Sequence, residues 1–187
     1  VMLYEVGESL MKAAPNPAHF ALAQLEEIGC IQAVITQNID ALHQEAGSST
    51  VIEYHGNAAT LICPACHRRS AMSLDHRDLG APRCVCGGCL KPDVVLFGDP
   101  IPPNALFTSD MLAQKCEALI VVGTSAQVYP AASLPVIAKE CGAYIVECNL
   151  EPTSFTHDIT DAFLQGPAGQ TLPRLVERVL ELRGSAN

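Results

Sequence analysis

Five of the nine cysteines in this 187-residue chain lie between positions 63 and 89. Cys63 and Cys66 form a C-x-x-C pair, and Cys84, Cys86 and Cys89 follow at the separation typical of four-cysteine zinc sites. Thiolates paired in this way readily close a tetrahedron, whereas free loop thiols need no such pattern. Four sulfur ligands leave no open position for water, so the sequence predicts a structural zinc ion and not a catalytic one.

Three later cysteines compete for two positions in this predicted site. Spacing alone favours Cys86 and Cys89, because they repeat the C-x-x-C pattern. A disulfide framework is a poorer explanation, since such frameworks are typical of small secreted chains. The other cysteines stand in apolar stretches and are expected in the core: Cys30, Cys116, Cys141 and Cys148.

Polar residues crowd the end of a predicted strand in TQNIDALH (36–43). In open parallel sheets, small molecules bind beyond the carboxyl ends of the strands, so Gln37, Asn38 and Asp40 are candidate ligand-binding residues. A capping turn explains the same residues equally well, because Asn and Asp favour turns. This segment alone does not decide between the two interpretations.

A second polar segment, GTSAQVYPA (123–131), also follows a predicted strand. Gly123 allows close approach of the backbone, and the hydroxyls of Thr124 and Ser125 with the following helix N-terminus are suited to a phosphate or ribose. A tight turn with an N-cap serine explains the segment almost as well.

His55 lies in YHG (54–56), between a predicted strand and the cysteine-rich segment. A single histidine is more often structural than catalytic. The position of His55 at a junction where clefts form makes it a candidate functional residue.

The remaining sequence supplies the elements that position these residues. Asn16 and Pro17 begin a helix that Gly29 ends. Strand and helix patterns then alternate: strand 31–36, helix 105–116, strand 118–122, helix 131–141, strand 143–147 and a last helix closed by Gly184. This alternation predicts the α/β class, with a doubly wound parallel sheet. Residues 57–92 interrupt it and predict a small inserted module held by zinc.

Charge and composition exclude several classes of function. The formal net charge of -9 argues against a direct nucleic-acid partner and fits a basic one, such as a lysine-bearing peptide. No stretch approaches the roughly 20 apolar residues of a membrane span, and no basic-then-apolar leader is present. We therefore expect a cytoplasmic protein with no membrane partner.

The ordered set of motifs resembles one family. TQNIDALHQEAG, YHG, C-x-x-C with its cysteine cluster, LKPDVVLFGD, GTSAQVYPA and CNLEPT are similar to the sirtuin family of NAD-dependent protein deacylases. The resemblance implies a Rossmann-like NAD-binding domain formed by residues 1–56 and 93–187. It also implies a small zinc-binding domain over residues 57–92, with the acyl-lysine substrate, a protein or peptide, in the cleft between the two.

The resemblance implies His55 as the general base of a reaction that consumes NAD. In this chemistry the acyl oxygen attacks C1′ of the nicotinamide ribose, nicotinamide leaves and an alkylimidate forms. The histidine then helps a ribose hydroxyl attack the imidate, which yields free lysine and O-acyl-ADP-ribose. Acetyl is the expected acyl group.

The resemblance also assigns binding roles. The residues it implies for NAD are Gln37, Asn38, Asp40, Gly123, Thr124, Ser125 and Asn149. The edge implied to pair with the substrate backbone by β-augmentation consists of Val94, Val95, Phe97 and Gly98.

The family register decides among the cysteines differently from spacing. It places the last ligand five residues before the Lys of KPDVV, which is Cys86 before Lys91. Its partner is then Cys84. The implied zinc ligands are Cys63, Cys66, Cys84 and Cys86, with Cys89 as a bystander.

The chain departs from the family pattern at several points, one of which is the irregular spacing of the cysteines. Ala41 and Asp99 replace the usual Gly and Glu, and the family's GAGxS and DFR segments have no counterpart here. We therefore expect a piece of a longer protein, with a shortened protein as the alternative. The alternative function is a catalytically silent module that binds acyl-lysine peptide or ADP-ribose.

Overall fold

The computed structural model describes residues 12–72, 81–96 and 98–185. The helices of this part are α2 (Pro17–Glu27), α3 (Leu42–Glu45), α4 (Pro103–Lys115), α5 (Leu134–Glu140), α6 (Ser154–Asp158) and α7 (Ala168–Gly184). The strands are β1 (Val34–Thr36), β2 (Val51–Glu53), β3 (Gly56–Ile62), β4 (Arg69–Ala71), β5 (Lys91–Val94), β6 (Ala118–Val122), β7 (Tyr144–Asn149) and β8 (Ala162–Gln165).

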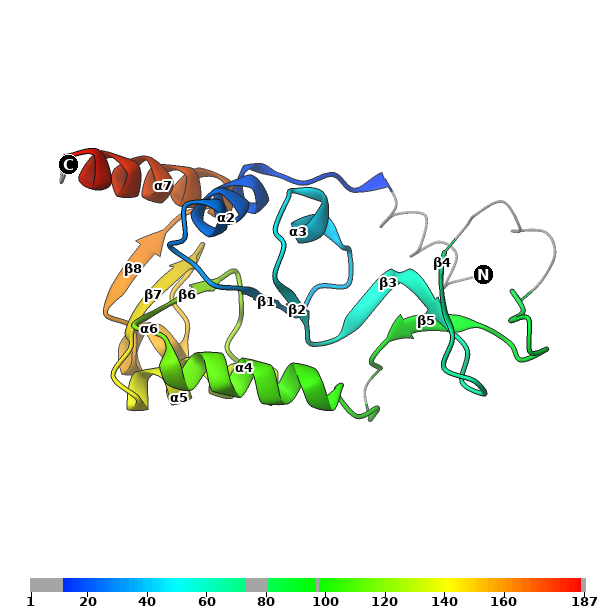
Figure 1. The fold of residues 1–187 in the computed structure, drawn as a ribbon. Coiled ribbons are helices and arrows are strands. Elements are labelled where there is room, and N and C mark those ends of the chain that lie inside the picture. The colour runs from blue at the N-terminus through cyan, green and yellow to red at the C-terminus, as the bar shows by residue number, and fades with distance from the viewer. Residues whose placement is uncertain (1–11, 73–80, 97, 186–187) are drawn as a thin grey trace.

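The parallel strands form the middle layer of an α/β arrangement (Figure 1). β1 pairs with β2, and β6, β7 and β8 form a second parallel sheet in that order. α2 and α7 lie on one side of this layer, and α4 and α5 lie on the other. The predicted doubly wound, Rossmann-like class is confirmed, because parallel strands are covered by helices on both faces.

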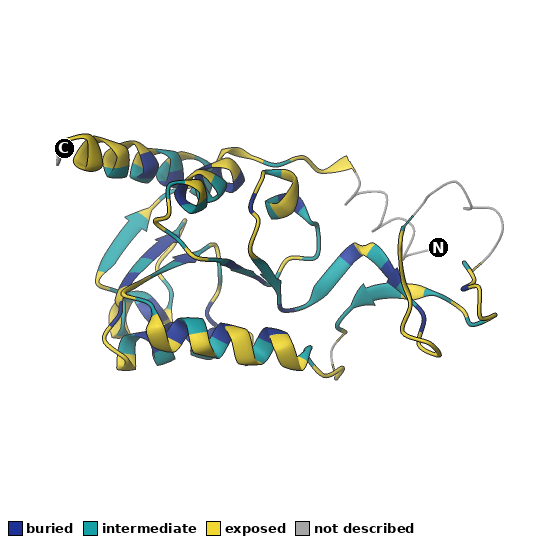
Figure 2. Ribbon diagram, in the orientation of Figure 1, coloured by how far each residue is buried: buried dark blue, intermediate teal, exposed yellow. Residues whose placement is uncertain are grey.

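Two hydrophobic clusters hold these layers together, one on each side of β6 and β7 (Figure 2). Val121 and Ile145 belong to the cluster on the α4 and α5 side. Cys148 and Leu172 belong to the cluster on the α2 and α7 side. The buried parts of β6 and β7 lie between these helices. Successive side chains of a strand point to opposite faces, so β6 and β7 contribute to both clusters.

The sequence of α2 explains where this helix begins and ends. The side chain of Asn16 accepts a hydrogen bond from the backbone N–H of Ala18, and Nδ1 of His19 accepts one from the N–H of Asn16. Pro17 needs no partner at the first helical position. Gly29, at φ 72°, follows the last turn in the left-handed conformation that ends many helices. The predicted start and stop of this helix are confirmed.

Some local expectations are wrong. The sequence predicts neither α3, α6 nor β8, because elements this short carry too little periodicity. The helix expected over 131–141 begins as a 3-10 turn, Ala131–Ser133, before α5. Cys30 and Cys141 are exposed and not in the core. Each lies just beyond the last turn of a helix, where the chain returns to the surface.

A small antiparallel sheet, ordered β4-β3-β5, joins the parallel layer through the turn between β2 and β3. Gly56 begins β3 and pairs with Val94 of β5. Its φ is 75°, and a Cβ atom at this position would overlap the carbonyl oxygen of Asp93. Only glycine therefore allows β5 to approach β3 this closely.

A buried carboxyl group fixes the segment that follows β7. Glu147 is 1% exposed, and its carboxyl oxygens accept hydrogen bonds from Thr153 (2.6 Å), Thr156 (2.6 Å) and Thr160 (2.9 Å). These three hydroxyls come from the N-cap of α6, its first turn and the residue after its C-cap. The carboxyl group thus ties α6 to the strand that carries Asn149.

We expect Glu147→Ala to lower the free energy of unfolding by about 3–5 kcal/mol, because it leaves a cavity and three hydroxyls without their acceptor. Thr160→Val is the matched control. It removes one of these bonds and is expected to cost about 1 kcal/mol. Equilibrium urea unfolding of both variants measures the difference. Equal losses would show that the carboxyl group does not organise this segment.

Candidate functional site

His55 lies in the turn between β2 and β3, where the parallel layer meets the small sheet. Its Nδ1 is 3.0 Å from the carbonyl oxygen of Gln37. Because a carbonyl oxygen only accepts, Nδ1 carries the proton in this bond, and Nε2 of the neutral ring keeps a free lone pair. The geometry therefore makes Nε2 the basic atom of His55.

Tyr54 anchors this turn in the core. It is 1% exposed, and its ring lies 6.2 Å from the His55 ring, centroid to centroid, in an edge-to-face arrangement. Burial, and then the charge of Asp110, raise the pKa of Tyr54, so it remains a neutral phenol. Tyr54 belongs to the same hydrophobic cluster as Ile35 and Ala126. The His55 turn and the two polar strand ends therefore stand on one common core.

The first polar segment leaves β1 and runs beside the His55 turn. Gln37 and Asp40 are half-buried and Asn38 is exposed. The backbone N–H of Ala58 donates to the carbonyl of Ile39 at 2.8 Å, which ties the segment to β3. Oδ1 of Asp40 accepts from the N–H of Leu42 at 3.0 Å, as a capping turn would. The segment is thus both a turn and a neighbour of His55.

Ala41 has φ 62° and ψ 10°, the left-handed conformation. This is the position where the family resemblance implies glycine. An L-residue pays about 1–2 kcal/mol there, because its Cβ crowds the following carbonyl oxygen. The turn that presents Asp40 is therefore strained at Ala41.

The second polar segment follows β6, the first strand of the other parallel sheet. Gly123 and Ser125 are exposed, and Oγ1 of Thr124 accepts from the N–H of Ala126 at 3.3 Å. A Cβ atom at Gly123 would meet nothing within 4 Å, so the space in front of this turn is open. Nδ2 of Asn149, at the end of β7, donates to the carbonyl of Thr124 at 2.8 Å. This bond brings the predicted ribose and phosphate residues together.

The predicted peptide-binding edge continues from β5. Val94 is the last residue of β5, and the N–H of Val95 donates to the carbonyl of His55 at 2.9 Å. This contact places the edge directly beside the His55 backbone. Gly98 lies in the turn that follows, whereas Phe97 lies outside the described residues.

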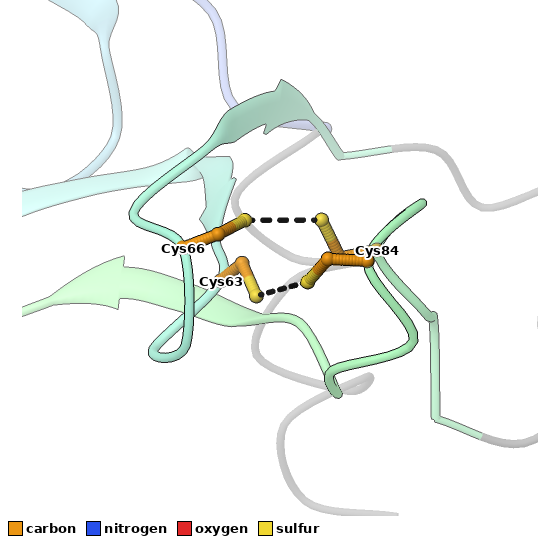
Figure 3. Close-up of side chains that lie close together, drawn as sticks. Cys63, Cys66 and Cys84 are labelled. Carbon is orange, nitrogen blue, oxygen red and sulfur yellow. Dashed lines mark hydrogen bonds between the residues drawn. The ribbon is translucent and has the colours of Figure 1, made fainter.

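Four cysteine side chains converge where two loops of the small sheet meet (Figure 3). The Sγ atoms of Cys63, Cys66, Cys84 and Cys86 all lie within 4.8 Å of one another. Two pairs, Cys63 with Cys86 and Cys66 with Cys84, are 3.6 Å apart. Sulfur atoms that bind one zinc ion tetrahedrally at about 2.3 Å lie about 3.8 Å from each other. The cluster therefore fits Zn²⁺, and Cys89 is not part of it.

The neighbouring groups shift the pKa values of Cys63 and Cys66 in opposite directions. The backbone N–H of Cys66, aided by that of Ala65, lowers the pKa of Cys63 to about 7. The N–H of Arg68 acts in the same direction on Cys66, but the nearby thiols of Cys86 and Cys84 prevail and raise its pKa to about 12. Several thiolates repel each other at this distance unless a cation lies between them.

Gly88 is a contributor to this site that the sequence did not single out. A Cβ atom there would lie 2.9 Å from Sγ of Cys63 and 3.6 Å from Sγ of Cys86. Only a residue without a side chain lets the second loop close over the sulfur atoms. The CGGC sequence contains the signal, because Gly in a metal loop marks close approach.

A second overlooked contributor is Glu53, two residues before His55. Its Oε1 accepts from Nε2 of Gln44 at 2.7 Å and from Nδ2 of Asn57 at 2.6 Å. No sequence pattern announces these bonds, because the partners lie on different elements.

Comparison with known proteins now decides the family. The model of the Sir2 family matches residues 2–130. A relative from Pyrococcus furiosus, named NAD-dependent protein deacylase, is 49% identical over 92% of this chain and 71% of its own length. The chain belongs to the Sir2 family.

Solved Sir2 structures share the fold of this Sir2-family chain. A Sir2 homologue in complex with ADP-ribose has a TM-score of 0.89 and 38% identity, over 98% of this chain and 74% of the other. A Sir2 protein bound to a myristoylated histone peptide has a TM-score of 0.85 and 46% identity, over 98% of this chain and 80% of the other.

Within the described residues, no helix of the Sir2-family chain is both long and apolar enough to cross a membrane.

We predict that Cys84→Ser loses bound zinc, whereas Cys89→Ser retains about one ion per chain, because only Cys84 faces the other sulfur atoms. Native mass spectrometry of the two purified variants measures the stoichiometry. Loss of zinc in Cys89→Ser with retention in Cys84→Ser would reverse the ligand assignment.

We also predict that Ala41→Gly raises the free energy of unfolding by about 0.5–1 kcal/mol. Relief of the left-handed strain outweighs the greater freedom of glycine in the unfolded chain. Ala46→Gly is the control, since Ala46 has a right-handed conformation with φ −75°, and there glycine should destabilise. Urea unfolding of both variants gives the comparison. A loss of stability in Ala41→Gly would contradict the strain argument.

Proposed function

We propose that this Sir2-family chain removes acyl groups from lysine side chains of proteins, with NAD as co-substrate and His55 as the general base. The activity is that of the family. The observation that carries the role of His55 is the bond from its Nδ1 to the carbonyl of Gln37, which leaves Nε2 as the free base.

The surroundings of His55 support this assignment. The polar ends of β1, β6 and β7 lie at one edge of the parallel layer, which is where open α/β sheets bind nucleotides. We propose that these strand ends hold NAD through Gln37, Asn38, Asp40, Gly123, Thr124, Ser125 and Asn149. The open space before Gly123 and the bond that joins Asn149 to the Thr124 carbonyl support the ribose and phosphate part of this proposal.

We propose that the acyl-lysine peptide pairs with the edge that follows β5. β5 is an outer strand of its sheet, so its free backbone groups are able to bind an extended peptide. The bond from the N–H of Val95 to the carbonyl of His55 would bring a peptide on this edge close to the base. Val94, Val95, Phe97 and Gly98 are the proposed substrate residues, and acetyl is the proposed acyl group.

The metal cluster has a structural part in this proposal. When bound, Zn²⁺ would offset part of the negative charge of the thiolates of Cys63, Cys66, Cys84 and Cys86 and hold the two loops of a small domain over residues 57–92. Sulfur atoms then occupy all four coordination positions of the zinc ion, so the metal has no catalytic role. We propose a cytoplasmic site of action, because thiols that bind a metal stay reduced in that compartment.

We predict that His55→Ala lowers kcat for deacetylation at least about 100-fold, the scale of general-base catalysis. Release of nicotinamide precedes the step that needs the base, so exchange of labelled nicotinamide into NAD should continue. His157→Ala, which removes an exposed histidine of α6, is the control and should be unaffected. The assay incubates the protein with NAD and an acetyl-lysine peptide, and follows free lysine peptide and nicotinamide.

Two outcomes would contradict the proposal in different ways. If neither this chain nor a longer protein that contains it releases nicotinamide, the protein is a silent binding module. If His55→Ala still deacetylates at the unaltered rate, His55 is not the base.

A further inference from the structure

The carboxylate of Glu53 closes the turn that contains His55. Glu53 is the last residue of β2, and Asn57 is the second residue of β3. The 2.6 Å bond from Nδ2 of Asn57 to Oε1 of Glu53 therefore joins the two ends of the turn, with His55 in its middle. Asn57 is itself fixed, because its Oδ1 accepts from the N–H of Ala59 at 2.8 Å.

The same oxygen of Glu53 reaches a second element. Nε2 of Gln44, on α3, donates to Oε1 at 2.7 Å. α3 directly continues the segment whose Gln37 carbonyl holds Nδ1 of His55. One carboxylate oxygen therefore connects the turn that carries the imidazole to the segment that orients it.

The hydrogen bonds of Glu53 contribute more to the position of His55 than to the stability of the fold. The backbone of the turn is already held by bonds from Tyr54 N–H to the carbonyl of Thr36 and from Val95 N–H to the carbonyl of His55, both 2.9 Å. Glu53 and Asn57 also line an open cleft of about 720 Å³. Water in this cleft is able to replace lost hydrogen bonds, so removal of the carboxylate should cost little stability.

A small displacement of the imidazole of His55 should affect the rate of proton transfer far more than it affects stability. A base has to lie within hydrogen-bond reach of the proton it accepts, and an error of about 1 Å in placement is able to cost about 100-fold in rate. Charge-assisted bonds such as those of Glu53 are the short, strong kind that hold such a position.

We propose that Glu53 is a positioning residue for His55, which holds the imidazole against the Gln37 carbonyl by bridging Gln44 and Asn57. This inference rests on the proposed role of His55 as base. It predicts that the step after nicotinamide release depends on Glu53 and that the release itself does not.

The experiment compares Glu53→Ala, Glu53→Gln and Glu45→Ala in the complete protein. Deacetylation kcat and nicotinamide exchange are measured for each variant. Glu53→Ala should lower kcat at least tenfold and leave exchange within twofold. Glu53→Gln should recover most of the rate, because an amide oxygen is able to accept both bonds. Glu45→Ala, which removes an exposed carboxylate from α3, should match the unaltered protein.

The Asn57→Ala variant tests the bridge itself. Asn57 and Glu53 belong to one network. The variant that combines Glu53→Ala with Asn57→Ala should therefore have a deacetylation kcat no lower than that of Glu53→Ala alone. If Glu53→Ala does not fold, Gln44→Ala and Asn57→Ala replace it in the assays of deacetylation and nicotinamide exchange. The inference then requires that these two variants lose deacetylation and keep exchange.

Three results would overturn the inference. They are an unchanged kcat in Glu53→Ala, an equal loss of deacetylation and exchange, and a failure of Glu53→Gln to recover rate. The His55→Ala variant separates this failure from that of the proposed function. If His55→Ala loses deacetylation while Glu53→Ala does not, His55 remains the base and only the role of Glu53 is wrong.

Discussion

The absence of a side chain at Gly56 is the constraint on which the rest of the site depends. The carbonyl oxygen of Asp93 occupies the space that a Cβ atom would need, so β5 is able to lie against the start of β3. This close approach brings the N–H of Val95 to the carbonyl of His55. The edge proposed for the substrate and the proposed base are therefore connected through one backbone contact.

The sulfur cluster acts at the other end of the same strands. Cys63 follows β3 directly, and Cys86 comes five residues before β5 begins. Drawing these two thiols to 3.6 Å brings the far ends of β3 and β5 together. The residues between them carry few apolar side chains, so a metal ion would stabilise this sheet where a hydrophobic core does not. The metal would thus act on the His55 turn only through the pairing of β3 with β5.

Sequence patterns predicted the strands β1, β2, β6 and β7 of the parallel layer and missed β8. The start of α2 at Pro17 follows from its capping residues, and the apolar run of β6 marks its bounds. Short elements such as α6 are missed because one or two turns show no periodicity. The prediction that Cys30 and Cys141 lie in the core is wrong for a related reason, since apolar neighbours in the sequence do not show where a helix ends. The conformation of the second loop brings Cys84, and not Cys89, to the first cysteine pair. The C-x-x-C spacing alone would have selected Cys89.

The hydrogen bonds of Glu53 show where sequence reasoning stops in the site itself. Motifs name the residues expected to touch a substrate, because their chemistry is distinctive. The groups that orient those residues are ordinary amides and carboxylates, and their roles arise only when folding brings α3, β2 and β3 together. A histidine needs one fixed nitrogen to present the other as a base, and fixing it requires several elements at once. The proposed chemistry of this chain is accordingly a property of the junction between the parallel layer and the small antiparallel sheet, and the His55 side chain alone would not provide it.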